Sequence, residues 1–404
     1  MKNFSHWLRP GVWTLSLAVV LGAGTVACTG DMGADGAEGP AGPMGSAGPT
    51  GPQGSGVVTP PLPAGAVYTM SDDATANEVF AFSRATDGTL VPLDVYATGG
   101  RGAANLKGTD QGSLAYSATK QLLFAVNAGD NSLTTFEMHA DGTLALLSIV
   151  DSGGIDPISV TVSGDYVYVV NAGSTTPEAA ANITGFQIQS GGLTAVTGST
   201  QALSAANPGP AEIAFNGDGS LLVVTEKGTN KIDTYVVTGG VAGAAKVQAS
   251  SGATPFGFAF SAGGELVVSE AGGGPDGTSA TSSYTASSTG VLTAISNSVP
   301  SSQTAACWLI VVGMQAVVAN AHSNDLSMYA IAADGTLTLN GNGSSATTGA
   351  APLDMAATAG GDFLYVIDAG AASLSSYAIA ADGSLTKQPD FAGLPATAVG
   401  LVAR

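Results

Sequence analysis

Short apolar runs recur along most of the chain, and each is followed by polar residues and a turn. The runs are rich in Val, Leu, Ile, Phe and Tyr, and clear examples cover residues 122–126, 166–170, 221–224, 266–268 and 363–367. Runs of this length and composition predict β-strands that are buried on both faces. We therefore expect a protein built mainly of short strands.

A turn phrase of the type Asp-Gly-Thr-Leu recurs seven times among these runs. Its aligned Leu or Val positions are Leu90, Leu144, Leu193, Val241, Leu292, Leu337 and Leu385. Subtraction of these positions gives a nearly constant spacing along the chain. A period just under 50 residues that is built of short strands is typical of a β-propeller blade. The predicted fold class is therefore all-β, a seven-bladed β-propeller.

The two ends of the repeat region are complementary. Residues 67–70 have the sequence of a second strand, and residues 396–402 have that of an innermost strand. We expect the C-terminal strand to complete the first blade, because an unpaired inner strand would leave an open sheet edge on the channel. Residues 67–404 are thus predicted to form one closed propeller domain.

The charge balance excludes one class of partner. The chain carries 11 Lys and Arg against 30 Asp and Glu, a formal net charge of -19. Removal of residues 1–27 would delete Lys2 and Arg9 and no acid, and 9 minus 30 gives -21. A surface this acidic repels nucleic acid, so we expect no nucleic-acid partner.

Residues 1–27 have the features of an export signal. Lys2 and Arg9 precede an apolar stretch over residues 12–25 that is short for a membrane helix. The following Thr-Val-Ala-Cys sequence resembles a bacterial lipoprotein signal, which implies lipidation of Cys28 and a membrane partner through that anchor. We predict an exported lipoprotein of the cell envelope, at the outer membrane or cell surface. Ordinary secretion is the alternative.

Residues 28–66 are predicted to be a tether. Eight unbroken Gly-X-Y triplets run over residues 30–53, and a Pro-rich linker follows them. Glycine at every third position is what a collagen triple helix requires. Two interpretations remain open, an extended spacer and a stalk that assembles a homotrimer.

Polar residues follow the apolar strands at corresponding positions in almost every blade. The ends of second strands supply Ser71 or Asp72, Asn127, Asn171, Glu226, Glu270, Asn320 and Asp368. The starts of first strands supply Asp110, Asp156, Glu212, Phe256, Trp308 and Asp354. Since first and second strands are antiparallel neighbours, we expect both sets at one rim of the central channel, a concave ligand site. The alternative is that Asn and Asp only cap turns there.

Three residues are candidates for catalysis. Glu226 and Glu270 are poor turn formers, so we predict that they activate water, directly or by holding a divalent cation such as Ca²⁺ or Mg²⁺. His322 has a suitable pKa for a general base, although a rim histidine is often only solvated. The predicted substrate-binding residues are Asn171, Glu212, Lys227, Phe256, Trp308, Asn320, Asp354 and Asp368.

These residues resemble the seven-bladed β-propeller lactonases, the family of bacterial 6-phosphogluconolactonases and fungal 3-carboxymuconate lactonizing enzymes. The similarity covers residues 67–404 and rests on the Asp-Gly-Thr-Leu turns, the second strands and the seam. Phrases at 209–213, 224–230 and 254–258 are similar to those of a secreted bacterial subgroup. The resemblance implies a propeller fold and lactone hydrolysis at the channel mouth.

The sequence departs from the family where a phosphorylated substrate would bind. Family members often carry Pro-His and channel arginines, whereas here the matching slots are Pro210-Ala-Glu212, Pro255-Phe256 and Pro352-Leu-Asp354. An acidic rim would repel 6-phosphogluconolactone. We therefore predict a small-molecule lactone that is neutral or bridged by a metal. The alternative function is a non-catalytic surface module that binds a glycan, a metal or a protein.

Overall fold

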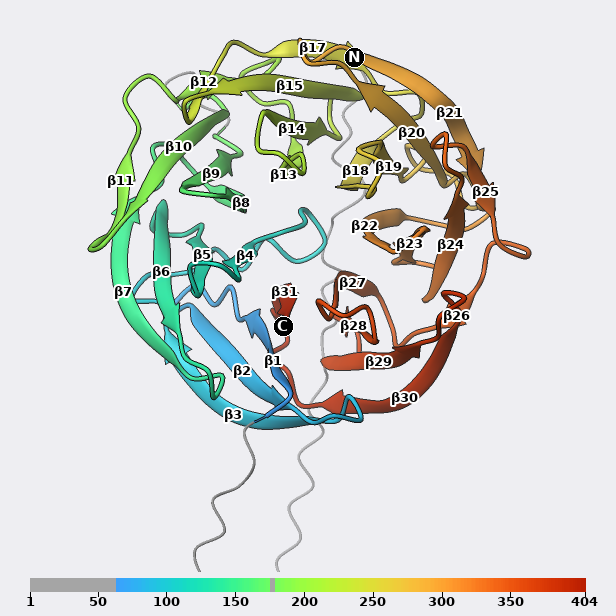
Figure 1. The fold of residues 1–404 in the computed structure, drawn as a ribbon, viewed down its shortest axis with the longest axis horizontal. Coiled ribbons are helices and arrows are strands. Elements are labelled where there is room, and N and C mark those ends of the chain that lie inside the picture. Colours follow the sequence, from blue (N-terminus) through green and yellow to red (C-terminus); the bar gives the residue numbers. More distant parts are fainter. Residues whose placement is uncertain (1–62, 175–178) are drawn as a thin grey trace, which may run out of the picture. The chain divides into compact units, whose positions relative to one another are not determined.

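The computed structural model describes residues 63–174 and 179–404, and in these ranges every regular element is a β-strand. They form seven antiparallel sheets arranged as a ring, as Figure 1 shows, and we call the region along its axis, between the innermost strands, the channel. The prediction of an all-β, seven-bladed propeller is confirmed. The predicted signal segment, Cys28 and the Gly-X-Y tether lie outside the described residues.

Each blade has four strands that run from the channel to the periphery. The innermost strands, in blade order, are β31 (Val399–Ala403), β4 (Leu114–Ser117), β8 (Pro157–Ser163), β13 (Pro210–Phe215), β18 (Pro255–Phe260), β22 (Ala306–Val312) and β27 (Pro352–Ala357). The second strands are β1 (Gly65–Met70), β5 (Leu122–Asn127), β9 (Tyr166–Asn171), β14 (Leu221–Glu226), β19 (Leu266–Glu270), β23 (Gln315–Asn320) and β28 (Phe363–Asp368).

The outer half of each blade is more exposed. The third strands are β2 (Glu78–Arg84), β6 (Ser132–Met138), β10 (Asn182–Gln189), β15 (Lys231–Thr238), β20 (Ala280–Ala286), β24 (Asp325–Ile331) and β29 (Ser373–Ile379). The fourth strands are β3 (Leu90–Ala97), β7 (Leu144–Asp151), β11 (Gly192–Ala195), β16 (Val241–Ala242), β21 (Leu292–Pro300), β25 (Leu337–Leu339) and β30 (Leu385–Ala392). Short extra strands pair with three of the third strands: β12 (Gln201–Ala202), β17 (Lys246–Ala249) and β26 (Ala346–Thr347).

The ring is closed by pairing between the two ends of the propeller. Strand β31 pairs antiparallel with β1, with Val67 opposite Ala403 and Tyr68 opposite Val402. Backbone hydrogen bonds between Ala66 and Arg404 extend the seam. The predicted completion of the first blade by the C-terminal strand is thus observed.

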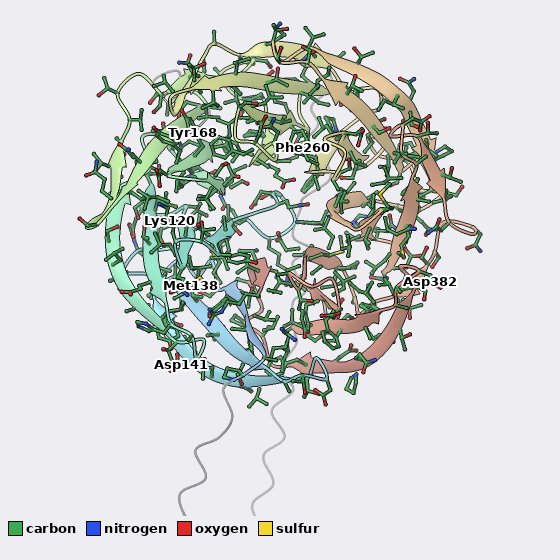
Figure 2. All side chains as sticks on the ribbon, viewed as in Figure 1. Lys120, Met138, Asp141, Tyr168, Phe260 and Asp382 are labelled. Carbon is green, nitrogen blue, oxygen red and sulfur yellow. The ribbon has the colours of Figure 1, made fainter. Side chains whose placement is uncertain are left out.

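The Asp-Gly turns owe their shape to local hydrogen bonds. In the first of them, the Asp87 carboxylate accepts from the Thr89 N–H at 2.9 Å, which lowers the pKa of Asp87. Gly88 has a φ of 87°, which an L side chain adopts only with strain. Asp141 and Asp382 begin two further turns of this kind and lie toward the periphery of the ring (Figure 2).

Adjacent blades are tied together at these same turns. Tyr68 in blade 1 donates its hydroxyl to the Gly142 carbonyl of blade 2 at 2.9 Å. The Tyr365 hydroxyl of blade 7 donates to the Gly88 carbonyl of blade 1 at 2.7 Å, across the ring closure. The turn glycine therefore supplies a carbonyl to the preceding blade, in addition to reversing its own strand.

Candidate functional site

The predicted rim separates into two shells of side chains. The strand ends are adjacent as expected, since Pro210 pairs with Glu226, Pro255 with Glu270 and Ala306 with Asn320. However, the residues that end second strands bond to their own blade and to the segment that enters it from the preceding blade, whereas those at the starts of first strands bond across the channel. We call these two sets the blade shell and the channel shell.

The blade shell repeats one hydrogen-bond arrangement. Asn127 is fully buried, and its amide donates to Ser132 Oγ at 3.0 Å and Thr134 Oγ1 at 2.8 Å. Its Oδ1 accepts from Asn77 Nδ2 and Thr98 Oγ1. The side chain thus joins the third strand of its own blade to the segment arriving from the preceding blade.

Asn171, Asn320 and Asp368 have comparable environments in their own blades. Asn171 Nδ2 donates to Asn182 Oδ1 at 2.9 Å, and Asn320 Nδ2 donates to Ser327 Oγ at 2.8 Å. Asp368 accepts from Ser375 Oγ at 2.6 Å, and burial raises its pKa to about 6. These three predicted substrate-binding residues are buried among their own strands.

Glu226 and Glu270 also belong to the blade shell. The Glu226 carboxylate accepts from the Ser204 backbone and hydroxyl and from Thr229 Oγ1, and its side chain is fully buried. The Glu270 carboxylate accepts from the Gly252 N–H at 2.8 Å and from Ser282 and Ser298 hydroxyls. Each carboxylate is therefore enclosed by donors of its own blade and of the connection that enters it from the preceding blade, and the two share no partner among the described contacts.

Blade 4 differs from this pattern at one position. Asp233 occupies the third-strand site that holds Thr134 in blade 2 and Ser282 in blade 5. It is fully buried, and neither of its oxygens has a partner of good hydrogen-bond geometry within the described ranges. Burial, followed by the neighbouring Glu226 carboxylate, raises the pKa of Asp233 to about 8.

His322, the third predicted catalytic residue, is exposed beyond the end of β23. Its backbone N–H donates to the Thr304 carbonyl, and its ring makes no described contact with the channel shell. The structure does not bring His322 together with Glu226 or Glu270. In the described part of the chain, no group of three or more His, Cys, Asp or Glu side chains is placed to hold a metal ion. The enclosed carboxylates of Glu226 and Glu270 do not fit a shared cation.

The channel shell surrounds a segment of which the sequence analysis named only Asp110, at the expected start of a first strand that in fact begins at Leu114. Residues 102–112 lie between β3 and β4, and the strand-free stretch before β4 extends toward the centre of the ring (Figure 1). Lys107 Nζ donates to the carbonyls of Ala369 and Ala396 at 2.8 and 2.7 Å. The segment therefore bridges from blade 2 to blade 7 over the channel mouth.

Gln111 links three blades from within the channel. Its side-chain amide donates to Leu309 O at 2.7 Å and accepts from Leu309 N at 2.8 Å in blade 6. Its backbone N–H donates to Ala211 O in blade 4, and Nε2 also donates to Glu212 Oε1 at 3.3 Å. Glu212 in turn accepts from the Phe258 N–H of blade 5 at 2.7 Å. The predicted residue Glu212 thus serves a cross-channel network.

Three ionisable groups converge under the segment. Lys227 Nζ donates to Thr109 O at 2.6 Å and also to Pro210 O. Desolvation lowers the pKa of Lys227 to about 8, while the nearby Asp110 opposes that shift. Burial raises the pKa of Asp110 well above its ordinary range, and the neighbouring Asp354 adds to the effect.

Asp354 is the third ionisable group at the mouth. Its two oxygens accept from the Gly112 N–H at 3.2 Å and the Gly400 N–H at 3.1 Å. Burial raises its pKa to about 6, against the lowering effect of those two hydrogen bonds. Burial also raises the pKa of Glu212 well above its ordinary range, so the mouth combines the Lys227 ammonium with three carboxyl groups whose pKa values are raised.

An aromatic wall completes the enclosure. The rings of Phe256 and Trp308 lie 5.1 Å apart, and both side chains are buried. Lys227 Nζ lies 5.6 Å from the Phe256 ring centroid, a cation–π distance. Trp308 Nε1 donates to Asp110 O at 2.8 Å. The structure thus brings together the predicted residues Glu212, Lys227, Phe256, Trp308 and Asp354.

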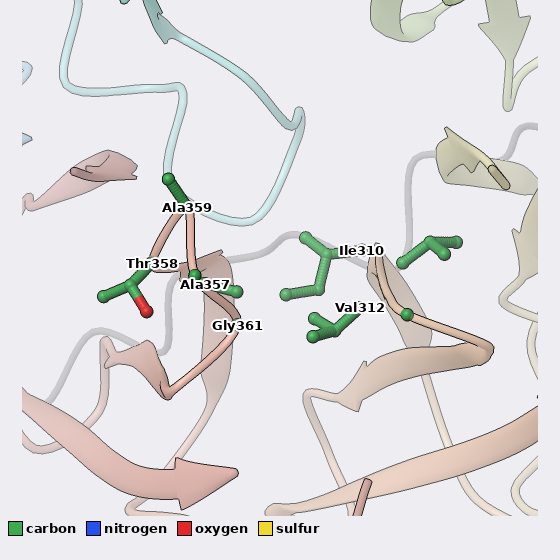
Figure 3. A pocket seen from close by; sticks show the side chains of 9 residues that line it. Ile310, Val312, Ala357, Thr358, Ala359 and Gly361 are labelled. Carbon is green, nitrogen blue, oxygen red and sulfur yellow. The ribbon is translucent and has the colours of Figure 1, made fainter. Parts of the chain in front are cut away.

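A separate pocket of about 350 Å³ lies at the other end of two inner strands. It is lined by the final residues of β22 and β27 and the turns after them, including Ile310, Val312, Thr358 and Gly361 (Figure 3). The described residues that line it carry no ionisable side chain. This pocket therefore has no described side chain that could act as a general acid or base.

Sequence reasoning missed Lys107 and Gln111, which hold the covering segment. A signal was available, because the spacing from Leu90 to Leu144 is the widest between successive turn positions. The additional residues are not needed for the blade motif, and they form the connection between β3 and β4.

In the described residues, no helix is long and apolar enough to cross a membrane.

The comparisons with known proteins agree with this architecture. Residues 66–204 match the family model described as "Lactonase, 7-bladed beta-propeller". The chain is similar to the propeller lactonases. No curated protein sequence matches it.

Solved structures share the lactonase-like fold over most of the chain. A putative 6-phosphogluconolactonase from Bacteroides fragilis has 17% identity and a TM-score of 0.65, covering 84% of this chain and 98% of its own. A periplasmic gluconolactonase from Pseudomonas aeruginosa has 19% identity and a TM-score of 0.66, with 83% and 99% covered. A protein from Lactobacillus plantarum has 20% identity and a TM-score of 0.67, with 84% and 99% covered. At these identities the likeness establishes the fold alone.

Proposed function

We propose that this propeller hydrolyses lactones at the channel mouth. The observation that carries the proposal is the convergence of Lys227, Asp110 and Asp354, with shifted pKa values, in one desolvated enclosure. The similarity of residues 66–204 to the lactonase family supports this reaction class. So do the names of two structural neighbours, a gluconolactonase and a putative 6-phosphogluconolactonase.

Lactone hydrolysis needs a base for water, a donor for the oxyanion and an acid for the ring oxygen. Asp354 suits the base, because a pKa of about 6 leaves it ionised at neutral pH. The Lys227 ammonium suits the oxyanion, and the protonated Asp110 suits the acid. Water adds to the carbonyl carbon as Asp354 takes its proton, and the ring C–O bond breaks as Asp110 protonates the leaving oxygen.

The charge state of the enclosure favours an uncharged substrate. Burial raises the pKa values of Asp110 and Glu212 well above their ordinary range, which reduces the negative charge around the Lys227 ammonium and the Asp354 carboxylate. The sequence-based expectation of a strongly acidic rim did not include this effect of burial. The other lysine at the mouth, Lys107, is engaged by the Ala369 and Ala396 carbonyls and not by an anion, so neutral lactones remain the proposed class.

The alternative function, a non-catalytic module that binds a glycan, a metal or a protein, has one observation in its favour. Residues 102–112 fill the mouth with their own backbone, which Lys227 and Trp308 bind through side-chain donors. A propeller whose channel is closed in this way could present other surfaces to a partner. The activity test below separates the two functions.

The test is lactone hydrolysis by the full chain, followed by pH-stat with glucono-1,5-lactone, δ-valerolactone and 6-phosphogluconolactone. We expect turnover of the neutral lactones, and a fall in kcat/KM of about 100-fold or more in Asp354→Asn and in Lys227→Met. Asp362→Asn, an exposed carboxylate outside the mouth, is the matched control. Absence of turnover on all three lactones would favour the binding module.

The cellular setting is part of the proposal and has its own test. We propose a lipid anchor on Cys28 and an envelope location, with the Gly-X-Y tether as spacer or trimeric stalk. Mass spectrometry of the processed N-terminus should show an acylated Cys28, and Cys28→Ser should release the protein from the membrane fraction. Release of the unchanged protein in soluble form would support ordinary secretion instead.

A further inference from the structure

The exposed apolar side chains of the propeller are concentrated on two adjacent blades. Nine large apolar side chains are exposed among the described residues, and five of them belong to the fourth strands β3 and β7. Both strands lie at the outer edge of the ring (Figure 1), and the end of β3 approaches β7, since a Cβ atom on Gly99 would lie 2.5 Å from Ile149 Cδ1. A concentration of exposed apolar groups indicates an interaction surface, whereas single ones do not. The five side chains are Val91, Val95, Leu146, Leu147 and Ile149.

Strand β7 also lacks the features that protect the other outer edges. Long edge strands are usually blocked by proline or charged side chains, because an unpaired strand would otherwise pair with another chain. Pro92 lies in β3, and Lys387 and Pro389 lie in β30. Strands β11, β16 and β25 are short, and the exposed positions of β21 carry small or polar side chains and a proline. By contrast, β7 has eight residues, no proline and no charge before Asp151.

The two faces of β7 differ in exposure. On one face, a Cβ atom on Gly192 of blade 3 would lie 2.1 Å from Ser148 Oγ, so the neighbouring blade covers β7 there. On the other face, Leu146 and Ile149 are 52% and 43% exposed. In the described sheets, β7 ends its blade, and its outer backbone edge has no strand partner. The strand therefore presents unpaired backbone groups and an apolar face together.

The charge of the chain favours a second copy of the same edge as the occupant. The net charge is -19, yet residues 144–150 carry no charge. Contact through acidic parts of the surface would bring carboxylates of two copies together, whereas two β7 strands related by a two-fold axis place uncharged residues opposite one another. A basic partner would be attracted to the acidic surface and would gain nothing from this edge. Among the described outer strands, only β7 combines length, apolar exposure and the absence of proline, so the matching edge is β7 itself.

We propose that two copies of the chain form a dimer by antiparallel pairing of their β7 strands. The second blades of the two copies then become one continuous sheet across the two-fold axis, and each copy covers Leu146 and Ile149 of the other. One paired strand gives an area at or below the lower limit for stable complexes, about 1,200 Å² in total, so the dissociation constant should be roughly 1 to 100 μM. The dimer does not depend on lactone hydrolysis, because β7 lies at the periphery of the ring and not at the channel mouth (Figure 1).

Sedimentation equilibrium of the full chain tests the dimer over a concentration range of about 1 to 500 μM. We expect the average mass to rise reversibly from one copy to two. Leu146→Glu should weaken the association about tenfold or more, because each copy would bury a carboxylate in the apolar contact. Val247→Glu is the matched control, since Val247 is 42% exposed on β17 and the change adds the same charge away from β7.

The ionic strength gives a second signature. Raising NaCl from about 0.05 M to about 0.5 M screens the repulsion between two acidic copies, so the dimer should become tighter. Hydrogen exchange of the wild-type β7 amides should slow by about tenfold at concentrations well above the dissociation constant, because pairing protects them from solvent. This measurement does not require that Leu146→Glu be folded.

The possible outcomes separate the dimer from other assemblies. A concentration-dependent dimer that Leu146→Glu weakens and Val247→Glu retains would support the pairing of β7. A chain that stays monomeric at the highest concentration, with unchanged exchange of the β7 amides, would overturn it. So would a trimer that Leu146→Glu leaves intact without protection of β7, since that assembly would arise outside the propeller. Association that salt weakens would indicate a contact between opposite charges and would also contradict the proposal.

Discussion

The blade shell and the channel shell begin from the same sequence feature and have different uses. In both, a polar residue follows or precedes a buried apolar strand at the same end of a blade. Asn127, Glu226 and Glu270 are surrounded by donors and acceptors of their own blades and of the segments that enter them from the preceding blades. Asp110 instead lies in a segment that crosses to other blades, and Lys227 and Asp354 contact that segment. The comparison indicates that repetition marks structural roles here, and departures from repetition mark the candidate site.

Loss of ring closure should have the largest effect on stability, because the positions of both shells depend on the closed ring. Removal of residues 396–404 deletes β31, a buried strand that pairs with β1. We expect loss of the cooperative thermal transition measured by circular dichroism, because the first blade would keep an unpaired inner edge. Tyr365→Phe is a milder comparison at the same seam and should cost about 1 kcal/mol. A truncated protein that still melts cooperatively near the original temperature would contradict the closure argument.

The second-largest effect on stability is expected for replacement of Asn127 in the blade shell. Asn127→Ala removes a buried amide together with its hydrogen bonds to Thr98, Ser132 and Thr134. We expect a loss of about 3 kcal/mol in the free energy of unfolding, measured by urea titration, with turnover per folded molecule unchanged. The exposed Asn342→Ala is the control and should have little effect. A selective loss of turnover in folded Asn127→Ala would place this shell in the function instead.

Asp233 should make the free energy of unfolding depend on pH. Its folded pKa, about 8, lies above the ordinary carboxyl value, so the folded state retains a proton that the unfolded chain releases near pH 4. Its contribution to stability is therefore complete below about pH 4 and is lost as the pH rises through about 8. We expect the urea midpoint of the wild type to fall over this range, and Asp233→Ser to reduce that fall.

The groups facing Asp233 are Glu226, Tyr235 and Lys231, and the Asp233→Ser change leaves all three in place. Asp218→Ser is a matched control, because this exposed turn carboxylate has a lowered pKa from its bonds to Ser220. Equal pH profiles for wild type and Asp233→Ser, with Asp218→Ser also unchanged, would show that Asp233 has an ordinary pKa.

Much of the architecture could be predicted from sequence because each blade repeats the same local chemistry. The Asp-Gly turn, the apolar second strand and the complementary ends can each be recognised from a few consecutive residues. The candidate site was predicted only in part. Glu212, Lys227, Phe256, Trp308 and Asp354 do converge, but pattern alone did not separate them from the blade shell.

Two physical facts decided that separation, and neither is local in the sequence. One is the direction in which a strand-end side chain points, which Asn127 and Glu270 share because each has a third-strand partner. The other is the course of residues 102–112, which reach blade 7 through Lys107 and blade 6 through Gln111. The wide spacing between the first two turn leucines revealed surplus length but not its destination.

The smallest expected effect is also the sharpest test of the two-shell comparison. Glu226 and Glu270 were predicted from sequence to activate water, and that prediction remains open to experiment. Their carboxylates are saturated by donors such as Ser204, Thr229 and Ser282. We expect Glu270→Gln to change kcat/KM of the folded protein by less than about twofold, since it removes no interaction made in the proposed transition state. Initial rates by pH-stat, corrected for the folded fraction, measure this. A loss near that of Asp354→Asn would return catalysis to the blade shell, and it would require that the Glu270 network open during turnover.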